Sequence, residues 1–395
     1  MKILISFLIL SVTFISTASE KTGPWNLTDL YKAPKWEKTD KAAKEGMTGI
    51  LYNSIPLKGK AVQVFAYYST PAGKAPEGGW PAVVCVHGGG GTAFDAWVKS
   101  WNDHGYAAIS MDLEGHLPIG SHKQGRTPTP NPGPARVGVF HDFEKDIEEQ
   151  WYYHAVAQII LAHSLIRSFP EVNAEKTGIT GVSWGGNLTS TTMGVDSRFK
   201  FAIPAYGCGF LTGSDGHQGR TIKKGKHWDT VAKYYDGSAY FQNVNYPTLW
   251  VNGTNDHHFS MPATQKSSQA VKGDATIRFG LKMPHGHGPV WRTEECYAFA
   301  DSVIKKTPAL LKISSPAVND NSVSVKVAGE IKSAELLYTN DKDKIWPERE
   351  WKTAAAVING SQISAQIPKD AAAVFFNAKD SRGLMVSSEF IEIKK

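Results

Sequence analysis

Residues 178–186 of this chain read GITGVSWGG. The apolar run Thr177–Val182 predicts a strand, and a helix is expected from Trp184. Between them lies the pattern Gly-x-Ser-x-Gly, with Ser183 at its centre. This pattern is typical of a tight strand-to-helix turn, in which glycines relieve crowding and the serine hydroxyl projects from the apex. A glycine-rich chain can match five residues by chance, so the flanking strand and helix are what make Ser183 a candidate nucleophile.

Strand-like and helix-like stretches alternate on both sides of this turn. Continuous apolar runs are typical of strands buried on both faces. The clearest helical pattern covers residues 147–168 and ends before Pro170. The alternation predicts an α/β fold with a mostly parallel central sheet and helices on both faces. The expected strands are Gly49–Tyr52, Val62–Ser69, Ala82–Val86, Tyr106–Met111, Thr177–Val182, Phe201–Ala205, Thr248–Val251 and Ile277–Leu281.

Two later loops supply partners for Ser183. Asp256 follows a strand-like run, and His285 and His287 follow the next one. The order Ser, Asp, His is that of the α/β-hydrolase fold and differs from the orders in chymotrypsin and subtilisin. We expect Ser183, Asp256 and His287 to form a catalytic triad, because His287 lies about one turn before the helix expected from Arg292. His285 is the competing base and otherwise a substrate contact.

The glycine run after Ala82–Val86 is a candidate oxyanion hole. Residues 87–91 read HGGGG, and their unhindered backbone amides are expected to stabilise a negatively charged oxygen together with the amide of Trp184. Gly89 is the first choice and Gly90 the second. The alternative is a flexible loop at a strand exit.

Other polar and aromatic residues are candidates for substrate contacts. His87 and Trp228 are named for this role, and core packing is the alternative for the aromatic side chain. The zinc-ligand types present are His285 and His287, with His257, His258 and Asp256, but the strongest zinc patterns are absent. We expect no metal and no cofactor.

The chain divides into three expected regions. Lys2, an apolar stretch at 3–15 and the small residues at 16–18 predict a signal peptide at 1–18. A catalytic domain is expected at 19–306, with glycine- and proline-rich insertions at 114–145 and 207–243 that follow strands and should cover the carboxyl edge of the sheet. Short alternating runs predict a C-terminal β-sandwich accessory domain at 307–395.

Composition excludes several classes of protein. Hydrophobic residues make up 41% and charged residues 20%, so a core can form. The net charge is +6 with scattered basic residues, so neither nucleic acid nor an anionic membrane is an expected partner. Three cysteines are too few for a disulfide framework. With no later stretch long enough to span a bilayer, we expect a secreted or periplasmic protein.

Residues 45–305 resemble secreted bacterial α/β-hydrolases of the acetyl xylan esterase, dienelactone hydrolase and prolyl-oligopeptidase-like branch. The resemblance rests on residues 86–90, Tyr153–Gly186, Gly253–Asp256 and Gly286–His287. Dienelactone hydrolases proper carry Cys where Ser183 stands. Peptidase members usually carry a large N-terminal propeller, whereas here a short segment precedes the first strand.

The resemblance implies a serine esterase that removes acyl groups from an acylated carbohydrate or a small ester through an acyl-enzyme. Two alternatives stay open. One is a serine peptidase of the prolyl-oligopeptidase-like type. The other is a non-catalytic glycan-binding protein, with Trp346 and Trp351 as an exposed aromatic platform in the C-terminal domain. The sequence makes no prediction of the oligomeric state.

Overall fold

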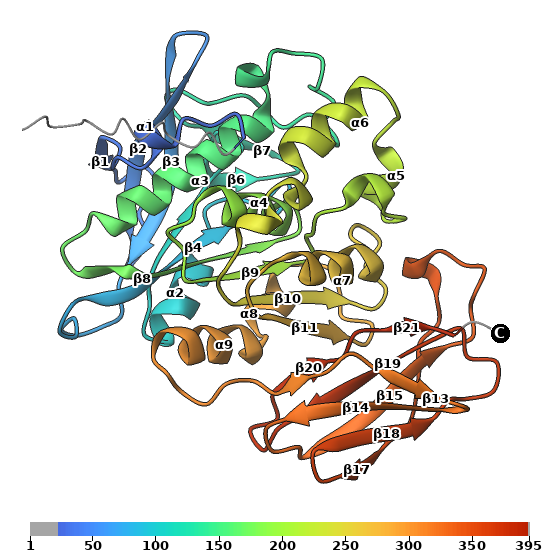
Figure 1. Cartoon of the computed structure of the whole chain (residues 1–395). Helices are drawn as coiled ribbons and strands as arrows, with labels where there is room; N and C mark the ends of the chain where they lie inside the picture. The colour runs from blue at the N-terminus through green and yellow to red at the C-terminus, as the bar shows by residue number, and fades with distance from the viewer. Residues whose placement is uncertain (1–22, 394–395) are drawn as a thin grey trace, which may run out of the picture.

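The central feature of the fold is a long twisted sheet (Figure 1). This is a computed structural model that describes residues 23–393, so the expected signal peptide at 1–18 lies outside the described residues. The sheet runs in the order β1-β2-β3-β5-β4-β8-β9-β10-β11 and continues into the C-terminal region. Strands β5, β4, β8, β9, β10 and β11 are parallel to one another, whereas β1, β2 and β3 pair antiparallel. The prediction of an α/β fold with a mostly parallel central sheet is confirmed.

The strands of this part vary in length. They are β1 (Trp36–Lys38), β2 (Thr48–Leu57), β3 (Lys60–Ser69), β4 (Trp80–Val86), β5 (Ala107–Met111), β8 (Val172–Val182), β9 (Phe201–Ala205), β10 (Thr248–Gly253) and β11 (Ala275–Gly280). All residues of β5, β9 and β10 are buried, as continuous apolar runs predict.

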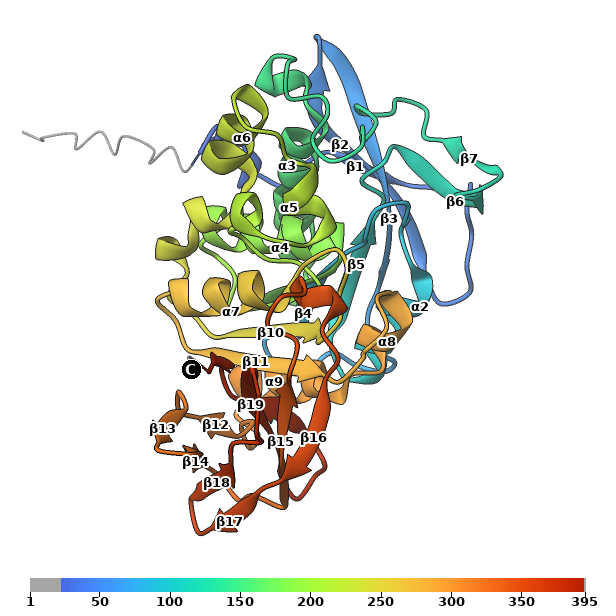
Figure 2. The same ribbon diagram turned by 90° about the vertical axis from the view of Figure 1, so that its right-hand side faces the viewer.

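Helices cover both faces of the sheet (Figure 2). On one face, α2 meets α9 through Trp101 and Tyr297, whose ring centroids are 4.8 Å apart. On the other face, α3 meets α4 through a 2.9 Å hydrogen bond between the hydroxyls of Tyr152 and Thr191. The helices are α1 (Leu27–Leu30), α2 (Asp95–Asp103), α3 (Trp151–Arg167), α4 (Trp184–Val195), α5 (His217–Thr221), α6 (Lys226–Thr230), α7 (Met261–Ala270), α8 (His287–Trp291) and α9 (Glu294–Ile304). Between residues 23 and 393, no helix is both long and apolar enough to cross a bilayer.

Helix α3 begins four residues later than the sequence pattern indicates. Ile147–Glu149 form a separate 3-10 turn, and the carboxylate of Asp142 accepts a 2.7 Å hydrogen bond from the backbone N–H of Trp151. That bond satisfies one of the free amides with which a helix begins. The start of α3 is therefore fixed by a residue of the 114–145 insertion, outside the periodic segment.

The two insertions contain short elements. A hairpin of β6 (His116–Ser121) and β7 (Gly125–Pro128) lies in the first, and α5 and α6 lie in the second. The first insertion contacts the glycine run, since the guanidinium of Arg126 donates to the carbonyls of Gly90 and Gly91. It therefore covers the carboxyl end of β4, as expected.

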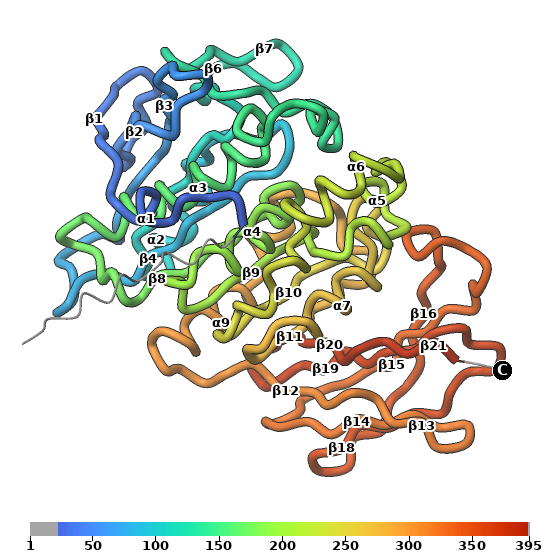
Figure 3. Tube along the Cα trace, turned by 45° about the horizontal axis from the view of Figure 1, so that its top comes forward, coloured from blue at the N-terminus to red at the C-terminus, as the bar shows by residue number. Residues whose placement is uncertain are grey.

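The C-terminal region is built of antiparallel strands. Strand β20 pairs with β11 at Ser387 and Ile277, so the large sheet continues into β20, β19, β15 and β16, with β21 beside β19 (Figure 3). A second sheet holds β12, β14, β18 and β17, with β13 beside β14. The strands are β12 (Lys312–Ile313), β13 (Ala317–Asn319), β14 (Ser322–Ala328), β15 (Ser333–Thr339), β16 (Lys352–Ala355), β17 (Val357–Asn359), β18 (Gln362–Gln366), β19 (Ala373–Lys379), β20 (Met385–Ser387) and β21 (Ile391–Glu392).

Residues 357–366 of this region form two strands, β17 and β18, which pair as a hairpin. Gly360 lies in the connecting turn with φ 57°, a left-handed conformation that glycine adopts without strain.

Candidate active site

Ser183 lies at the turn between β8 and α4, in a conformation that few residues adopt. Its φ is 61°, and its backbone N–H donates a 2.8 Å hydrogen bond to the carbonyl of Ala205. A Cβ on Gly185 would fall on the carbonyl oxygen of Val86, and one on Gly181 would fall on the carbonyl oxygen of Gly185. The glycines are thus required by close backbone approach, and the strain at Ser183 is of the kind found at functional sites.

His285 links Ser183 to Asp256. Its Nε2 lies 2.8 Å from the hydroxyl oxygen of Ser183, and its Nδ1 lies 2.5 Å from a carboxylate oxygen of Asp256. A carboxylate only accepts, so Nδ1 carries the hydrogen and Nε2 is left to accept from the serine hydroxyl. The expectation that His287 occupies this position is wrong, and the competing assignment to His285 fits the geometry.

The remaining groups hold Asp256 and His285 in place. The second carboxylate oxygen of Asp256 accepts 2.8 Å hydrogen bonds from the backbone N–H groups of His258 and Phe259. The hydroxyl of Tyr206 donates a 2.8 Å hydrogen bond to the carbonyl of Pro284, which fixes the loop beside His285. Asp256 is buried, so its charge acts on the imidazole with little screening by water.

His287 faces the glycine run instead. Its Nε2 accepts a 2.9 Å hydrogen bond from the backbone N–H of Gly88, and its ring packs against Phe94 and Trp291. Burial, then the nearby His87 and His285, lowers the pKa of His287 to about 3, so its ring is neutral at physiological pH. His287 is the first residue of α8, and helical side chains point back toward the helix N-terminus. This direction turns its ring toward Gly88.

His87 also contacts the glycine run at Gly88. Its Nδ1 lies 2.7 Å from the carbonyl oxygen of Gly88, and its Nε2 accepts a 2.9 Å hydrogen bond from the backbone N–H of Leu113. With the ring buried and both nitrogens occupied, His87 is a support of the loop, and the expectation of a substrate contact is wrong. Gly88 is therefore held through its carbonyl and its amide by two histidines.

These bonds decide which amides remain for an oxyanion. The N–H of Gly88 is donated to His287, that of Gly90 to Glu114 at 2.9 Å, and that of Gly91 to the carbonyl of Gly88. The amides of Gly89 and Trp184 make no hydrogen bond with any residue from 23 to 393. The assignment of Gly89 and Trp184 to the oxyanion hole stays a prediction, whereas the amide of Gly90 is occupied by Glu114.

Trp228 is the other aromatic residue predicted to contact the substrate. It is half-buried and packs against the hydrophobic core, and it makes no hydrogen bond or ring contact with Ser183, Asp256 or His285 among the described residues. Its contacts fit core packing, the alternative weighed for it, and its role as a substrate contact stays a prediction.

Sequence reasoning missed the pair Glu114 and Arg136. Burial opposes the ionisation of Glu114, but His87, Arg136 and the N–H of Gly90 outweigh it and lower the pKa of the carboxyl. Arg136 Nε lies 2.8 Å from Glu114 Oε1. Both residues lie in the 114–145 insertion, where the only signal was that the segment follows a strand and should cover the sheet edge.

The C-terminal region reaches the loop that carries Asp256. The side-chain amide of Asn255 donates to the carbonyls of Pro347 and Arg349, at 3.0 and 2.7 Å, and the N–H of Trp346 donates to Asp215 at 2.7 Å. Trp346 and Trp351 are both buried against this junction, so they do not form the exposed platform weighed as an alternative.

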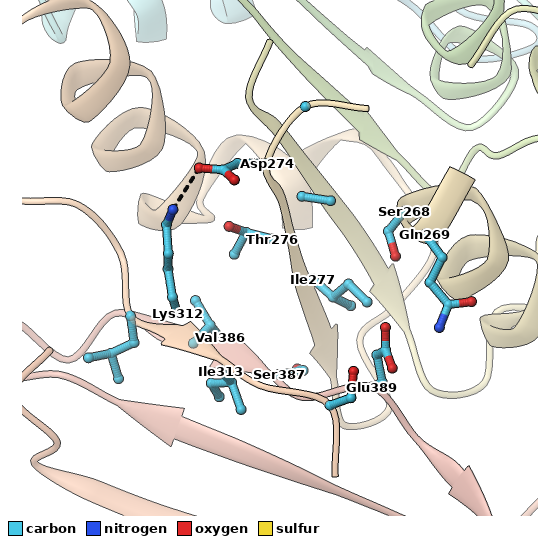
Figure 4. Close-up of a pocket in the computed structure, with 14 residues that line it drawn as sticks. Ser268, Gln269, Asp274, Thr276, Ile277, Lys312, Ile313, Val386, Ser387 and Glu389 are labelled. Carbon is cyan, nitrogen blue, oxygen red and sulfur yellow. Dashed lines mark hydrogen bonds and ion pairs between the residues drawn. The ribbon is translucent and has the colours of Figure 1, made fainter. Parts of the chain in front are cut away.

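A separate hollow lies where the C-terminal region joins the sheet (Figure 4). It measures about 320 Å³ and is lined by the start of β11 and by β12 and β20, with an ion pair of 2.6 Å between Lys312 and Asp274. Asp274 lies at the amino end of β11, whereas His285 follows its carboxyl end. The hollow is therefore at the opposite edge of the sheet from Ser183. Residues 23–393 hold no cluster of three or more His, Cys, Asp or Glu arranged to bind a metal.

Comparisons with known proteins agree with this fold. Residues 137–306 match the model of the prolyl oligopeptidase family. An acetyl xylan esterase from Paenibacillus sp. R4 is similar at 19% identity over 70% of this chain and 92% of that one, with a TM-score of 0.55. Acetyl xylan esterase 1 from Thermoanaerobacterium sp. JW/SL YS485 is similar at 14% identity over 64% and 83%, with a TM-score of 0.51.

A peptidase is also similar. The acylaminoacyl peptidase of Pyrococcus horikoshii is 19% identical over 68% of this chain and 44% of that one, with a TM-score of 0.50. The family match and the hydrogen-bonded chain from Ser183 to Asp256 support a serine hydrolase. The chain has the α/β-hydrolase fold, and its residues 137–306 carry the pattern of the prolyl oligopeptidase family.

Proposed function

We propose that this protein is a serine hydrolase that cleaves carboxylic esters, with acylated carbohydrates as its substrates. The observation that carries the proposal is the chain of hydrogen bonds from Asp256 through His285 to Ser183. Beside it are the backbone amides of Gly89 and Trp184, which make no hydrogen bond within residues 23–393. A nucleophile, a base oriented by a third group, and donors for a developing charge are the parts that acyl transfer requires.

Each residue has a role in the proposed reaction. Ser183 Oγ attacks the ester carbonyl while His285 Nε2 takes its proton, and Asp256 stabilises the resulting imidazolium. The amides of Gly89 and Trp184 receive the charge on the carbonyl oxygen. His285 then donates the proton to the departing alcohol. Water attacks the acyl-enzyme with His285 again as the base, which releases the acid and regenerates Ser183.

The coverage of the similar structures favours an ester over a peptide substrate. The two similar acetyl xylan esterases are covered over 92% and 83% of their own lengths, whereas the similar peptidase is covered over 44%. The peptidase is the second candidate, because the matching family model is that of prolyl oligopeptidase.

Turnover of matched substrates tests the proposal. Purified protein is assayed on p-nitrophenyl acetate, acetylated xylo-oligosaccharides and an acetyl-alanine p-nitroanilide, beside a Ser183→Ala variant. The proposal expects release of acetate from the two esters, no release of p-nitroaniline from the anilide, and loss of about 10⁴-fold or more in kcat in the variant. Cleavage of the anilide alone supports the peptidase, and wild-type activity in the variant overturns both.

The proposal includes export from the producing cell. The predicted signal at 1–18 requires the mature protein to begin after Ala18, and N-terminal sequencing of protein recovered from the producing cell's medium or periplasm measures this directly. An N-terminus that retains Met1 would contradict export by this route.

A further inference from the structure

Basic side chains of the 114–145 insertion gather on the glycine run that carries the Gly89 amide. Arg126 donates to the carbonyls of Gly90 and Gly91. A Cβ built on Gly90 would meet the His122 imidazole at 2.9 Å, and one built on Gly89 would meet Arg136 Nη2 at 3.1 Å. Glu114 is the carboxylate found bonded to this run. The insertion therefore brings more positive than negative groups to this side of Ser183.

Arg136 is held firmly in this position. Its Nε forms the 2.8 Å ion pair with Glu114, and its guanidinium carbon lies 5.6 Å from the ring centroid of Trp184 and 5.9 Å from that of Trp151. Contacts between a guanidinium and indole rings are attractive and restrict the arginine. Because three neighbours fix the group, little side-chain entropy is left to lose on binding a ligand.

One end of this guanidinium, Nη2, is free of hydrogen-bond partners within residues 23–393. The other, Nη1, donates a long hydrogen bond of 3.4 Å to the carbonyl of Gly138. The side chain is 21% exposed. The position of Gly89 Cβ lies 2.6 Å from Trp184 and 3.1 Å from Nη2, so the free end meets the two residues whose amides remain for the oxyanion. A group placed on Nη1 and Nη2 would therefore lie beside a bound ester.

We propose that Arg136 is a specificity-determining residue that binds a carboxylate carried by the substrate next to its ester. The planar guanidinium fork matches a carboxylate better than a hydroxyl, and the charge-assisted bonds are stronger in a partly buried site. The preferred substrates are then acyl esters of acidic sugars, such as acetylated uronic acids. This substrate class rests on the proposed ester hydrolysis.

Two matched probes separate charge from shape. Acetylated methyl glucuronoside carries a carboxylate where acetylated methyl glucoside carries a hydroxymethyl group. The kcat and KM for both are measured with wild type, Arg136→Gln and Arg136→Lys. The control is Arg167→Gln, which also removes an arginine paired with a glutamate, Glu175, but near the amino half of β8, away from Ser183. Thermal melting shows that each variant is folded.

The inference expects a clear pattern. Wild type prefers the acidic ester by about 10-fold or more in kcat/KM, mainly through KM. Arg136→Gln loses that preference because its kcat/KM falls more on the acidic ester than on the neutral ester, whereas Arg136→Lys keeps part of the preference. Arg167→Gln behaves as wild type. An equal loss on both esters would make Arg136 a support of the oxyanion loop, and no preference in wild type would equally overturn the inference.

A binding measurement separates this inference from the proposed reaction. Methyl glucuronoside without any ester is titrated into wild type and Arg136→Gln by calorimetry. Binding to wild type that is lost in the variant supports the carboxylate site even if no ester is hydrolysed, in which case only the proposed reaction fails. No binding to wild type, together with equal turnover of the two esters, overturns the carboxylate site and leaves the hydrolase in place.

Discussion

At the scale of single residues, the account depends on which histidine faces Ser183. His285 bonds to both Ser183 and Asp256, whereas His287 accepts from the amide of Gly88. The two imidazoles therefore have different effects on catalysis, one as the base and one as a support of the oxyanion loop. Their replacement separates these roles.

We expect His285→Ala to lower kcat for p-nitrophenyl acetate by about 10⁴-fold or more, because no other imidazole reaches Ser183 Oγ in the described chain. His287→Ala is expected to cost about 10–1,000-fold, since it releases Gly88 and thereby disturbs the neighbouring Gly89 amide. Steady-state kinetics of the two variants measures both effects. A larger loss in His287→Ala than in His285→Ala would contradict the assignment.

The sequence was sufficient for Ser183 and Asp256 but not for the histidine. Ser183 follows from a local turn motif, and Asp256 from its place at the end of a strand. His285 and His287 follow the same strand two residues apart, and only the starting point of α8 decides which ring points at Ser183. The local glycine run alone gives no reason to exclude Gly90. Its amide is occupied by Glu114, which lies 24 positions away in the sequence.

At the scale of elements, the turn between β8 and α4 requires glycine at fixed positions. Gly185 lies where a Cβ would strike the carbonyl oxygen of Val86 on the neighbouring strand β4. Backbone atoms on a buried strand have little freedom to move, so an added methyl group forces the helix away from the sheet.

We expect Gly185→Ala to lower the free energy of unfolding by about 2 kcal/mol or more and to abolish activity. Gly213→Ala is the matched control, because a Cβ at Gly213 meets no atom within 4 Å and the residue lies outside the sheet. Urea unfolding followed by fluorescence gives both values. Equal stability of the two variants would show that the crowding at Gly185 is relieved at small cost.

The loop that carries Asp256 depends on hydrogen bonds to the C-terminal region. Asn255 bonds to two carbonyls of the C-terminal region, in residues 347 and 349, that are more than 90 positions away in the chain. We expect Asn255→Ala to reduce kcat by about 10-fold or more while KM for p-nitrophenyl acetate stays nearly constant, because Asp256 loses its support while the substrate contacts remain. A change in KM alone would place Asn255 in substrate binding.

At the scale of the whole molecule, the C-terminal region is part of the same sheet. Strand β20 pairs with β11, and the N–H of Met385 donates a 2.8 Å hydrogen bond to the buried carboxylate of Glu295. Sequence periodicity predicted short strands here but not this union, because pairing between strands more than 100 residues apart leaves no local signal. We expect a chain that ends at residue 306 to be poorly soluble, since removal of β20 leaves β11 as an unprotected edge.

Buried neutral histidines make the whole molecule sensitive to acid. Burial lowers the pKa of His163 from 6.5 to about 4 in spite of Asp196, and that of His287 to about 3. Below about pH 6.5 the unfolded chain binds protons that the folded chain does not, so stability is full above that pH and is lost as the pH falls toward 4 and 3.

We therefore expect the urea concentration at the midpoint of unfolding to decrease as the pH is lowered from about 7.5 to about 4.5. At the higher pH, His163→Gln should have a lower urea midpoint than wild type, because the substitution weakens the bonds of residue 163 to Asp196 and Thr177. Its midpoint should decrease less than that of wild type on acidification. A wild-type midpoint that is the same at both values would contradict the neutral state of these rings.

The most direct test of the central claim is covalent labelling with a fluorophosphonate, followed by peptide mass spectrometry. Such a reagent reacts with a serine that a neighbouring base activates. We predict a single adduct on the peptide that contains Ser183, lost in His285→Ala and retained in His287→Gln. Labelling of another serine, or labelling of His285→Ala at the wild-type rate, would contradict the assignment of Ser183 and His285 as nucleophile and base.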